Sequence, residues 1–545
     1  MPDRFDGVPT DLATVARDVG ALLLIEAGLM FVSVLIATVF GEWYVGLGFL
    51  LAATATAAVG LAARRRFADA PPPVIKHGMV IAAGGWLFVA LFGAVPFYLS
   101  ALLVPAEVQA NYVAAGAPYG SSLQYFASPM HALFESMSGW TGSGLTMAVH
   151  EPSLPRTVQW WRSLIQWVGG VGVVVLTVSI LARPGSGSYA LYRSETRERK
   201  IHPSVVSTVR TIWKVFLLYT GLAVVAMFVA ISASDYGARL TLFETAWQAL
   251  NHAMTGLSTG GFSVTDDSIA TYNSPLVEVV LLPVMTVGAI AFPVHYAFLS
   301  NRDLGRFIDD LQTRWLFGLL VAGALVLAVQ NVAAIHRADF GQLVATPWDV
   351  GLSAVAIDAV RDAVFQFVSA LTCTGFQSSP IRTWSDGGKL LLSGAMILGG
   401  AAGSTVGGIK IVRGYTAVRG MIWQFSRVFL PENAVVSTTI DDRRLSREEM
   451  EREFAEAAVV SLLWVILLAV GSLVLVNTTP SQFGYVDALF EVASAQGNVG
   501  LSTGITGPTM SPIAEGMLVL NMWIGRLEII PVLVFVRAAL FGLHP

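Results

Sequence analysis

The sequence predicts an all-α integral membrane protein with about ten transmembrane helices. Hydrophobic residues make up 54% of the 545 residues and charged residues only 13%, a balance outside the range of ordinary soluble domains. Apolar segments of the length that spans a bilayer, about 20 residues, recur from Ala21 to the C-terminus. A short motif also recurs four times at nearly regular intervals, which indicates four comparable structural units.

The first apolar segment, residues 21–40, is expected to be an uncleaved transmembrane helix. Acidic residues precede it, whereas a secretory leader begins with basic ones. They are Asp3, Asp6, Asp11 and Asp18. With the second apolar segment it forms a two-helix hairpin, and residues 1–75 are assigned to this N-terminal part. The only cysteine, Cys373, excludes an intrachain disulfide.

Basic residues collect in alternate loops, and short basic loops remain in the cytoplasm. They follow the second, fourth, sixth and eighth segments: Arg64, Arg65, Arg66 and Lys76; Arg183, Arg193, Arg197, Arg199 and Lys200; Arg302, Arg306 and Arg314; Arg413, Arg419, Arg427, Arg443, Arg444, Arg447 and Arg452. The other loops are poorer in basic residues and carry Glu107, Glu151, Asp235, Asp266, Asp267, Asp349 and Asp386. Both termini are therefore expected in the cytoplasm.

The repeated motif consists of four windows of eleven residues that align without gaps. They read "FESMSGWTGSG", "NHAMTGLSTGG", "FQFVSALTCTG" and "FEVASAQGNVG", and they end at Gly144, Gly261, Gly375 and Gly500. The intervals between these glycines are 117, 114 and 125 residues. The fifth residue always carries a hydroxyl group and the sixth is always small: Ser138, Thr255, Ser369 and Ser494; Gly139, Gly256, Ala370 and Ala495.

This spacing predicts repeats of helix, short re-entrant segment and helix. The expected boundaries are residues 76–205, 206–305, 306–430 and 431–545. Four such repeats around one axis give a pseudo-fourfold arrangement of helix, pore loop and helix that encloses a single central ion pore. Non-helical backbone at membrane depth survives only where it lines a watery path or is buried in protein.

Glycine suits such a path because it adopts backbone angles that turn its carbonyl inward and leaves the axis open. Rings of carbonyl oxygens replace the water shell of a monovalent cation, and each short helix directs the negative end of its dipole at the same point. The candidate ion-binding residues are Thr141, Gly142, Ser143, Gly144, Ser258, Thr259, Gly260, Gly261, Thr372, Cys373, Thr374, Gly375, Gly497, Asn498, Val499 and Gly500.

The four windows admit two other interpretations. Small residues commonly form helix-packing surfaces in membrane proteins, but packing does not explain why the four windows share one register. An intramembrane hydrolase needs a Ser, Thr or Cys nucleophile with a nearby base. Ser143 lacks the strand-turn-helix context of a hydrolase elbow, Cys373 has no evident histidine partner, and neither a zinc motif nor a P-loop occurs. An enzyme is therefore not expected.

At these windows the chain resembles the Trk/Ktr/HKT superfamily of potassium transporters, most closely the TrkH-type membrane subunit of prokaryotic Trk potassium uptake systems. Other similar segments are "WWRSLIQWVGGVGVVVLTVSIL" from Trp160, "GGAAGSTVGGIKIVRG" from Gly399, "FEVASAQGNVGLSTG" from Phe490 and "IGRLEIIPVL" from Ile524. The resemblance implies potassium uptake through a selectivity filter containing the four window glycines. A sodium-permeable or weakly selective cation channel is the alternative, because the first window has Gly142 and Ser143 where the family often has threonines.

The resemblance also implies a gate and an electrostatic barrier. The gating loop is an irregular intramembrane segment of the third repeat, formed by Gly399, Gly400, Ala401, Ala402, Gly403, Ser404, Thr405, Gly407, Gly408 and Lys410. Its glycine content also makes it a poor helix. Lys410 either holds the loop or reaches the cytoplasmic surface. Arg526 is expected to face the pore as a barrier, with pairing to Glu528 as the alternative. His252 is expected to form local hydrogen bonds.

The implied partners are a cytosolic nucleotide-binding subunit of the TrkA type and a second copy of the chain in a homodimer. Residues 184–203 and 414–453 are basic and offer docking surfaces, although topology alone also makes such loops basic. No nucleic acid partner and no cofactor are expected beyond the transported potassium ion. The expected location is the cell membrane.

Overall fold

The computed structural model describes residues 8–114, 116–181, 205–335, 354–429, 438–440 and 443–543. The helices of the N-terminal half are α1 (Thr10–Phe40), α2 (Trp43–Arg66), α3 (Ile75–Leu103), α4 (Ala106–Gln109), α5 (Pro129–Thr141), α6 (Arg156–Leu181), α8 (Val205–Ser232) and α9 (Leu242–Leu257). Those that follow are α10 (Pro275–Ala289), α11 (Phe292–Asn301), α12 (Gly305–Asp309), α13 (Leu311–Ile335), α14 (Ala354–Leu371), α15 (Asp386–Ile397), α16 (Ile411–Val428), α17 (Arg447–Thr478), α18 (Tyr485–Gly497), α19 (Pro512–Arg526) and α20 (Ile530–Phe541).

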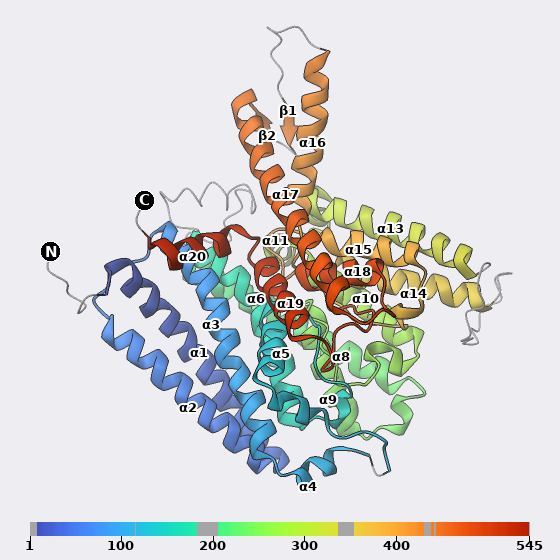
Figure 1. Cartoon of the computed structure of the whole chain (residues 1–545). Coiled ribbons are helices and arrows are strands. Elements are labelled where there is room, and N and C mark those ends of the chain that lie inside the picture. The colour runs from blue at the N-terminus through green and yellow to red at the C-terminus, as the bar shows by residue number, and fades with distance from the viewer. Residues whose placement is uncertain are drawn as a thin grey trace.

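Short 3-10 helices occupy Ala110–Tyr112, Ser122–Ala127, Glu151–Ser153, Gly237–Arg239, Ser268–Tyr272 and Ile381–Thr383. The strands β1 (Thr438–Ile440) and β2 (Arg443–Leu445) pair antiparallel, with Thr439 opposite Arg444. They connect α16 to α17, and these two helices project from the rest of the helical bundle (Figure 1). Part of the basic segment 414–453 therefore stands away from the bundle, whereas residues 184–203 lie outside the described residues.

The predicted N-terminal hairpin consists of α1 and α2 and lies at one edge of the bundle (Figure 1). Gly41 ends α1 with a φ of 67°, in the left-handed region that glycine tolerates. Further along the hairpin the helices touch through Gly20 and Gly60, because a Cβ atom built on either would lie 2.8 Å from the carbonyl oxygen of the other. The hairpin packs against α3 and α6 and so supports the first repeat.

Each of the four repeats supplies a long outer helix, a short helix that leads into the motif window, and an inner helix. The outer helices are α3, α8, α13 and α17, the short helices are α5, α9, α14 and α18, and the inner helices are α6, α10, α15 and α19. Every short helix packs against the outer helix of its own repeat. The order of helix, re-entrant segment and helix confirms the predicted repeat.

Six helices in the described ranges are long and apolar enough to cross a membrane, namely α1, α2, α3, α8, α13 and α17. The bent pair α10 and α11 adds a seventh span when it is counted as one. The other three of the roughly ten predicted spans correspond to α6, α15 and α19. These inner helices contain buried polar side chains or end at an interruption, which is tolerated where a helix faces the bundle interior. The predicted class, an all-α integral membrane protein, is confirmed.

Three inner helices are broken where they pass the motif windows. Between α10 and α11 the axis bends by 105°, and Pro293 near the start of α11 cannot continue the hydrogen bonding of α10. Between α15 and α16 lies the predicted irregular segment, residues 398–410, here called the third-repeat loop. Between α19 and α20, Glu528 and Ile529 take positive φ angles of 59° and 70°.

Candidate functional site

The four motif windows meet in a closed ring. In each repeat the window glycine lies against the carbonyl oxygen of the tenth window residue of the next repeat, and the fourth repeat returns to the first. A Cβ atom built on the glycine would lie between 1.8 and 2.7 Å from that oxygen; the pairs are Gly144 with Gly260, Gly261 with Thr374, Gly375 with Val499, and Gly500 with Ser143. The structure therefore brings together all four segments that the sequence singled out.

The four windows also share one backbone conformation. The window glycines have φ angles of 74°, 76°, 83° and 105°. The ninth window residues, Gly142, Thr259, Cys373 and Asn498, are also left-handed, with φ between 53° and 71°. Because both the φ angle and the neighbouring carbonyl exclude a side chain, glycine is required at the eleventh position. At the ninth position other residues are accommodated at some cost in strain.

Each window is closed by the same hydrogen bond. The amide of the tenth residue donates to the carbonyl oxygen of the fifth over 2.8 to 2.9 Å, in the pairs Ser143 with Ser138, Gly260 with Thr255, Thr374 with Ser369 and Val499 with Ser494. The short helices end inside the windows, at the seventh or eighth residue. Their C-terminal carbonyl groups, which carry the negative end of the helix dipole, thus stand at the ring.

Several predicted hydroxyl ligands are bonded within the protein. Thr141 and Ser143 share a hydrogen bond of 2.8 Å, as do Thr372 and Thr374. Asn498 Nδ2 donates to Ser143 Oγ over 2.8 Å, which ties the fourth window to the first. These contacts stabilise the windows and leave the backbone carbonyl groups as the recurring feature of the ring.

The second window position holds a set of residues that the sequence reasoning missed as a group. Its members are Glu135, His252, Gln366 and Glu491, all buried. Each bonds to the segment two or three residues beyond its window glycine: Glu135 with the amide of Met147, His252 with the hydroxyl of Ser263, Gln366 with the amide of Ser378, and Glu491 with the amide of Thr503. A polar residue at this position in all four windows was the signal. His252 forms local hydrogen bonds, as predicted.

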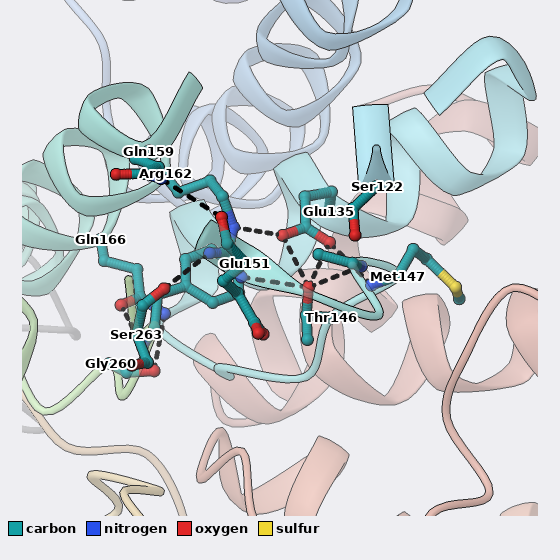
Figure 2. A network of polar contacts seen from close by, with 12 residues as sticks. Ser122, Glu135, Thr146, Met147, Glu151, Gln159, Arg162, Gln166, Gly260 and Ser263 are labelled. Atoms are coloured by element: carbon teal, nitrogen blue, oxygen red, sulfur yellow. Dashed lines mark hydrogen bonds and ion pairs between the residues drawn. The ribbon is translucent and has the colours of Figure 1, made fainter. Parts of the chain in front are cut away.

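Arg162 on α6 joins the first two windows through a buried network (Figure 2). Its Nε donates to Glu135 over 2.6 Å, and its Nη1 donates to the carbonyl oxygen of Ser263 over 2.8 Å. One turn further along α6, Gln166 donates to the carbonyl oxygen of Gly260 and accepts from the amide of Phe262. Sequence reasoning did not single out either side chain, because the contacts with Ser263 and Gly260 join residues about 100 positions apart.

Glycines of the inner helices make a second set of close approaches that the sequence did not identify. A Cβ atom on Gly169, Gly288 or Gly525 would lie 1.9 to 2.4 Å from the carbonyl oxygen of the seventh window residue of the same repeat. These oxygens belong to Trp140, Leu257 and Gln496. The inner helices thus press directly on the ends of the short helices.

The third-repeat loop is buried beside this ring. It contacts the second repeat through the amides of Ala401 and Thr405, which donate to the carbonyl oxygens of Ala289 and Gly288 over 3.0 and 3.2 Å. A Cβ atom on Gly407 would lie 2.3 Å from the carbonyl oxygen of Gly497 in the fourth window. Lys410 Nζ donates to carbonyl oxygens of the loop itself, at Val406 and Gly407.

Arg526, at the end of α19, is buried and points into the space between repeats. Its Nη1 donates to the carbonyl oxygen of Thr405 over 2.7 Å, and its Nη2 donates to Gly169 and Gly170 over 2.9 and 3.2 Å. The alternative pairing with Glu528 is wrong. Glu528 instead binds Arg413 over 2.5 Å, because the break after α19 turns the two side chains apart.

Comparisons with known proteins agree with this fold. The TrkH family model, described as a cation transport protein, matches residues 77–541. An uncharacterized cation transporter of Methanocaldococcus jannaschii is 31% identical over 86% of this chain and 83% of its own length. The Trk system potassium uptake protein TrkH of Escherichia coli is 27% identical over 95% of this chain and 97% of its own.

A solved structure has the same fold. The crystal structure of the potassium transporter TrkH from Vibrio parahaemolyticus superposes with a TM-score of 0.76 at 22% identity, covering 97% of this chain and 99% of that one. The family match extends over most of the chain and includes all four motif windows. This chain therefore belongs to the TrkH family of cation transport proteins.

Proposed function

We propose that this chain is the pore-forming subunit of a Trk-type system and carries potassium ions into the cell. The closed ring of four glycine segments, each glycine against a carbonyl oxygen of the next repeat, is the observation that carries the proposal. Four equivalent backbone segments suit a dehydrated monovalent cation, because carbonyl dipoles replace its water shell. The potassium uptake named for the relatives supports the choice of cation.

The proposed selectivity filter comprises the tenth and eleventh window residues and those leading to them, from Thr141, Ser258, Thr372 and Gly497 onwards. The third-repeat loop is the proposed gate, since it is buried beside the windows and lacks helical hydrogen bonding. Arg526 is the proposed barrier on the same path. Its guanidinium binds the loop through Thr405, which supports a role in holding the gate closed.

The proposed repeats are residues 76–205, 206–305, 306–430 and 431–545, after the hairpin in residues 1–75. We place the chain in the cell membrane with both termini in the cytoplasm, on the distribution of Lys and Arg. The projection formed by α16 and α17 then reaches into the cytoplasm, where it suits a nucleotide-binding regulatory subunit of the TrkA type. A homodimer completes the proposed assembly. Transport requires no bound cofactor.

Ion flux into proteoliposomes tests the proposal. The intact chain is expected to carry potassium and to exclude most sodium, and Gly500→Ser is expected to lose this preference because its Cβ would press on the carbonyl oxygen of Ser143. Equal flux of both ions through the intact chain would reject potassium selectivity and favour the alternative, a sodium-permeable channel. Absence of flux of either ion would reject transport by this chain alone.

A further inference from the structure

Two of the four second-position residues are carboxylates, and their surroundings differ. Glu135 is bound by the guanidinium of Arg162 over 2.6 Å, so its charge is compensated. Glu491, at the same position of the fourth window, is equally buried. In the part of the chain that the structure describes, Glu491 forms hydrogen bonds but no ion pair with Lys, Arg or His.

The partners of Glu491 are all donors. Its Oε1 accepts from the hydroxyl of Ser502 over 2.7 Å and from the amide and hydroxyl of Thr506. Its Oε2 accepts from the amide and hydroxyl of Thr503 over 3.0 and 3.1 Å. Five donors around two oxygens are the arrangement that a charged carboxylate needs when it is removed from water. Hydrogen bonds of this kind solvate the charge without cancelling it.

The position of this charge connects it to the pore. The donors belong to the segment that follows Gly500 by two to six residues, and Gly500 lies against Ser143 in the ring. A buried charge is weakly screened by salt, so its attraction for a cation extends over several ångströms. The opposite charge, that of Arg526, stands on the side of the ring where the third-repeat loop lies.

We propose that Glu491 supplies the negative potential that draws a monovalent cation into the ring at the fourth window, a role that Glu135 does not share because Arg162 neutralises it. The charge acts through space, and the same carboxylate positions the segment after Gly500. This inference rests on the proposed function, since it assumes that the ring conducts potassium.

The potassium concentration that gives half-maximal flux into proteoliposomes distinguishes an effect of the charge of Glu491 from an effect of its hydrogen bonds. Glu491→Gln removes the charge with little change in shape and is expected to raise the half-saturating potassium concentration roughly tenfold, with the maximal rate less affected. Glu491→Asp keeps the charge and is expected to stay within about threefold of the intact chain. Glu448→Gln removes an exposed carboxylate in the first turn of α17, away from the windows, and its half-saturation is expected to match that of the intact chain.

The outcomes are distinguishable from failure of the proposed function. If the intact chain carries no potassium, the proposed function fails first. If the intact chain carries potassium and Glu491→Gln has unchanged half-saturation, the role of Glu491 is rejected. If Glu491→Gln does not fold, Glu491→Asp and the double variant Ser502→Ala with Thr506→Val decide: a tenfold increase in either would mean that hydrogen bonding, and not charge, sets the affinity.

Discussion

Arg526 donates a hydrogen bond from Nη1 to the carbonyl oxygen of Thr405 over 2.7 Å, so a positively charged side chain of the fourth repeat binds the third-repeat loop. The same guanidinium reaches Gly169 and Gly170 of the first repeat. Three repeats are therefore connected at one side chain, directly beside the window ring. A charged group inside a span is costly unless it is well bonded, and these carbonyl oxygens provide the bonding.

Replacing Arg526 by glutamine should raise potassium flux. The change removes a positive charge from the proposed path and weakens the attachment of the third-repeat loop, and both effects lower the barrier to a cation. We expect an increase of several-fold in the initial rate of potassium entry into proteoliposomes. Arg537→Gln, on the exposed face of α20, is the matched control and should leave the rate unchanged. A decrease in flux for Arg526→Gln would argue against a barrier.

Removing one partner of the buried pair formed by Arg162 and Glu135 should strongly destabilise the protein. Both side chains are almost completely buried, so removing one leaves the other charged and unpaired. Breaking a buried pair in this way costs about 3–5 kcal/mol. Arg162→Gln is expected to lower the apparent melting temperature in detergent by many degrees. Arg447→Gln, which breaks an exposed pair with Glu451, should shift it by a degree or two at most. Equal shifts of the melting temperature in Arg162→Gln and Arg447→Gln would contradict a large cost of breaking the buried pair.

Glu26 should tolerate loss of its carboxyl group. It lies on α1 within the hairpin and is fully buried, with no ion-pair partner among the described residues. Such a site accommodates an uncharged group far better than a charged one. Glu26→Gln is therefore expected to keep the melting temperature or raise it, whereas Glu26→Lys should prevent recovery of folded protein. A large loss of stability in Glu26→Gln would reveal a required carboxylate.

Glu151 should make stability depend on pH. It lies in the segment between the first window and α6, where burial raises the pKa of its carboxyl from the ordinary 4.5 to about 8. The folded chain then holds a proton that the unfolded chain releases above pH 4.5. By linkage, this contribution to stability is complete below pH 4.5 and is lost as the pH rises to about 8. Melting temperatures of the intact chain and Glu151→Gln, compared between pH 5 and 8, should converge at the acidic end.

The windows were predictable because their pattern is local and repeated. Glycine at the same position of all four windows indicates a backbone with positive φ, which glycine adopts readily. The φ angles of Gly144 and Gly500, 74° and 105°, agree with this. The hairpin and the irregular third-repeat loop were predictable for similar reasons: an apolar segment of spanning length and a run of helix-poor residues are both visible in a short stretch of sequence.

Contacts between distant segments could not be predicted. The hydrogen bond between Asn498 and Ser143 joins residues 355 positions apart, and nothing in either window specifies the other as its partner. Nearness in sequence also misled, since Glu528 lies two residues from Arg526 yet binds Arg413. The backbone at Glu528 is left-handed, a conformation that glutamate rarely adopts and that its residue type does not predict.

Anomalous diffraction from crystals grown in rubidium or thallium salts tests most directly whether the four windows coordinate a cation. Both ions mimic potassium, and peaks are expected inside the ring bounded by the carbonyl oxygens of Ser143, Gly260, Thr374 and Val499. Crystals grown in sodium alone should show no ordered ion at these positions. Ordered rubidium or thallium at another place, with an empty ring, would contradict the proposed filter.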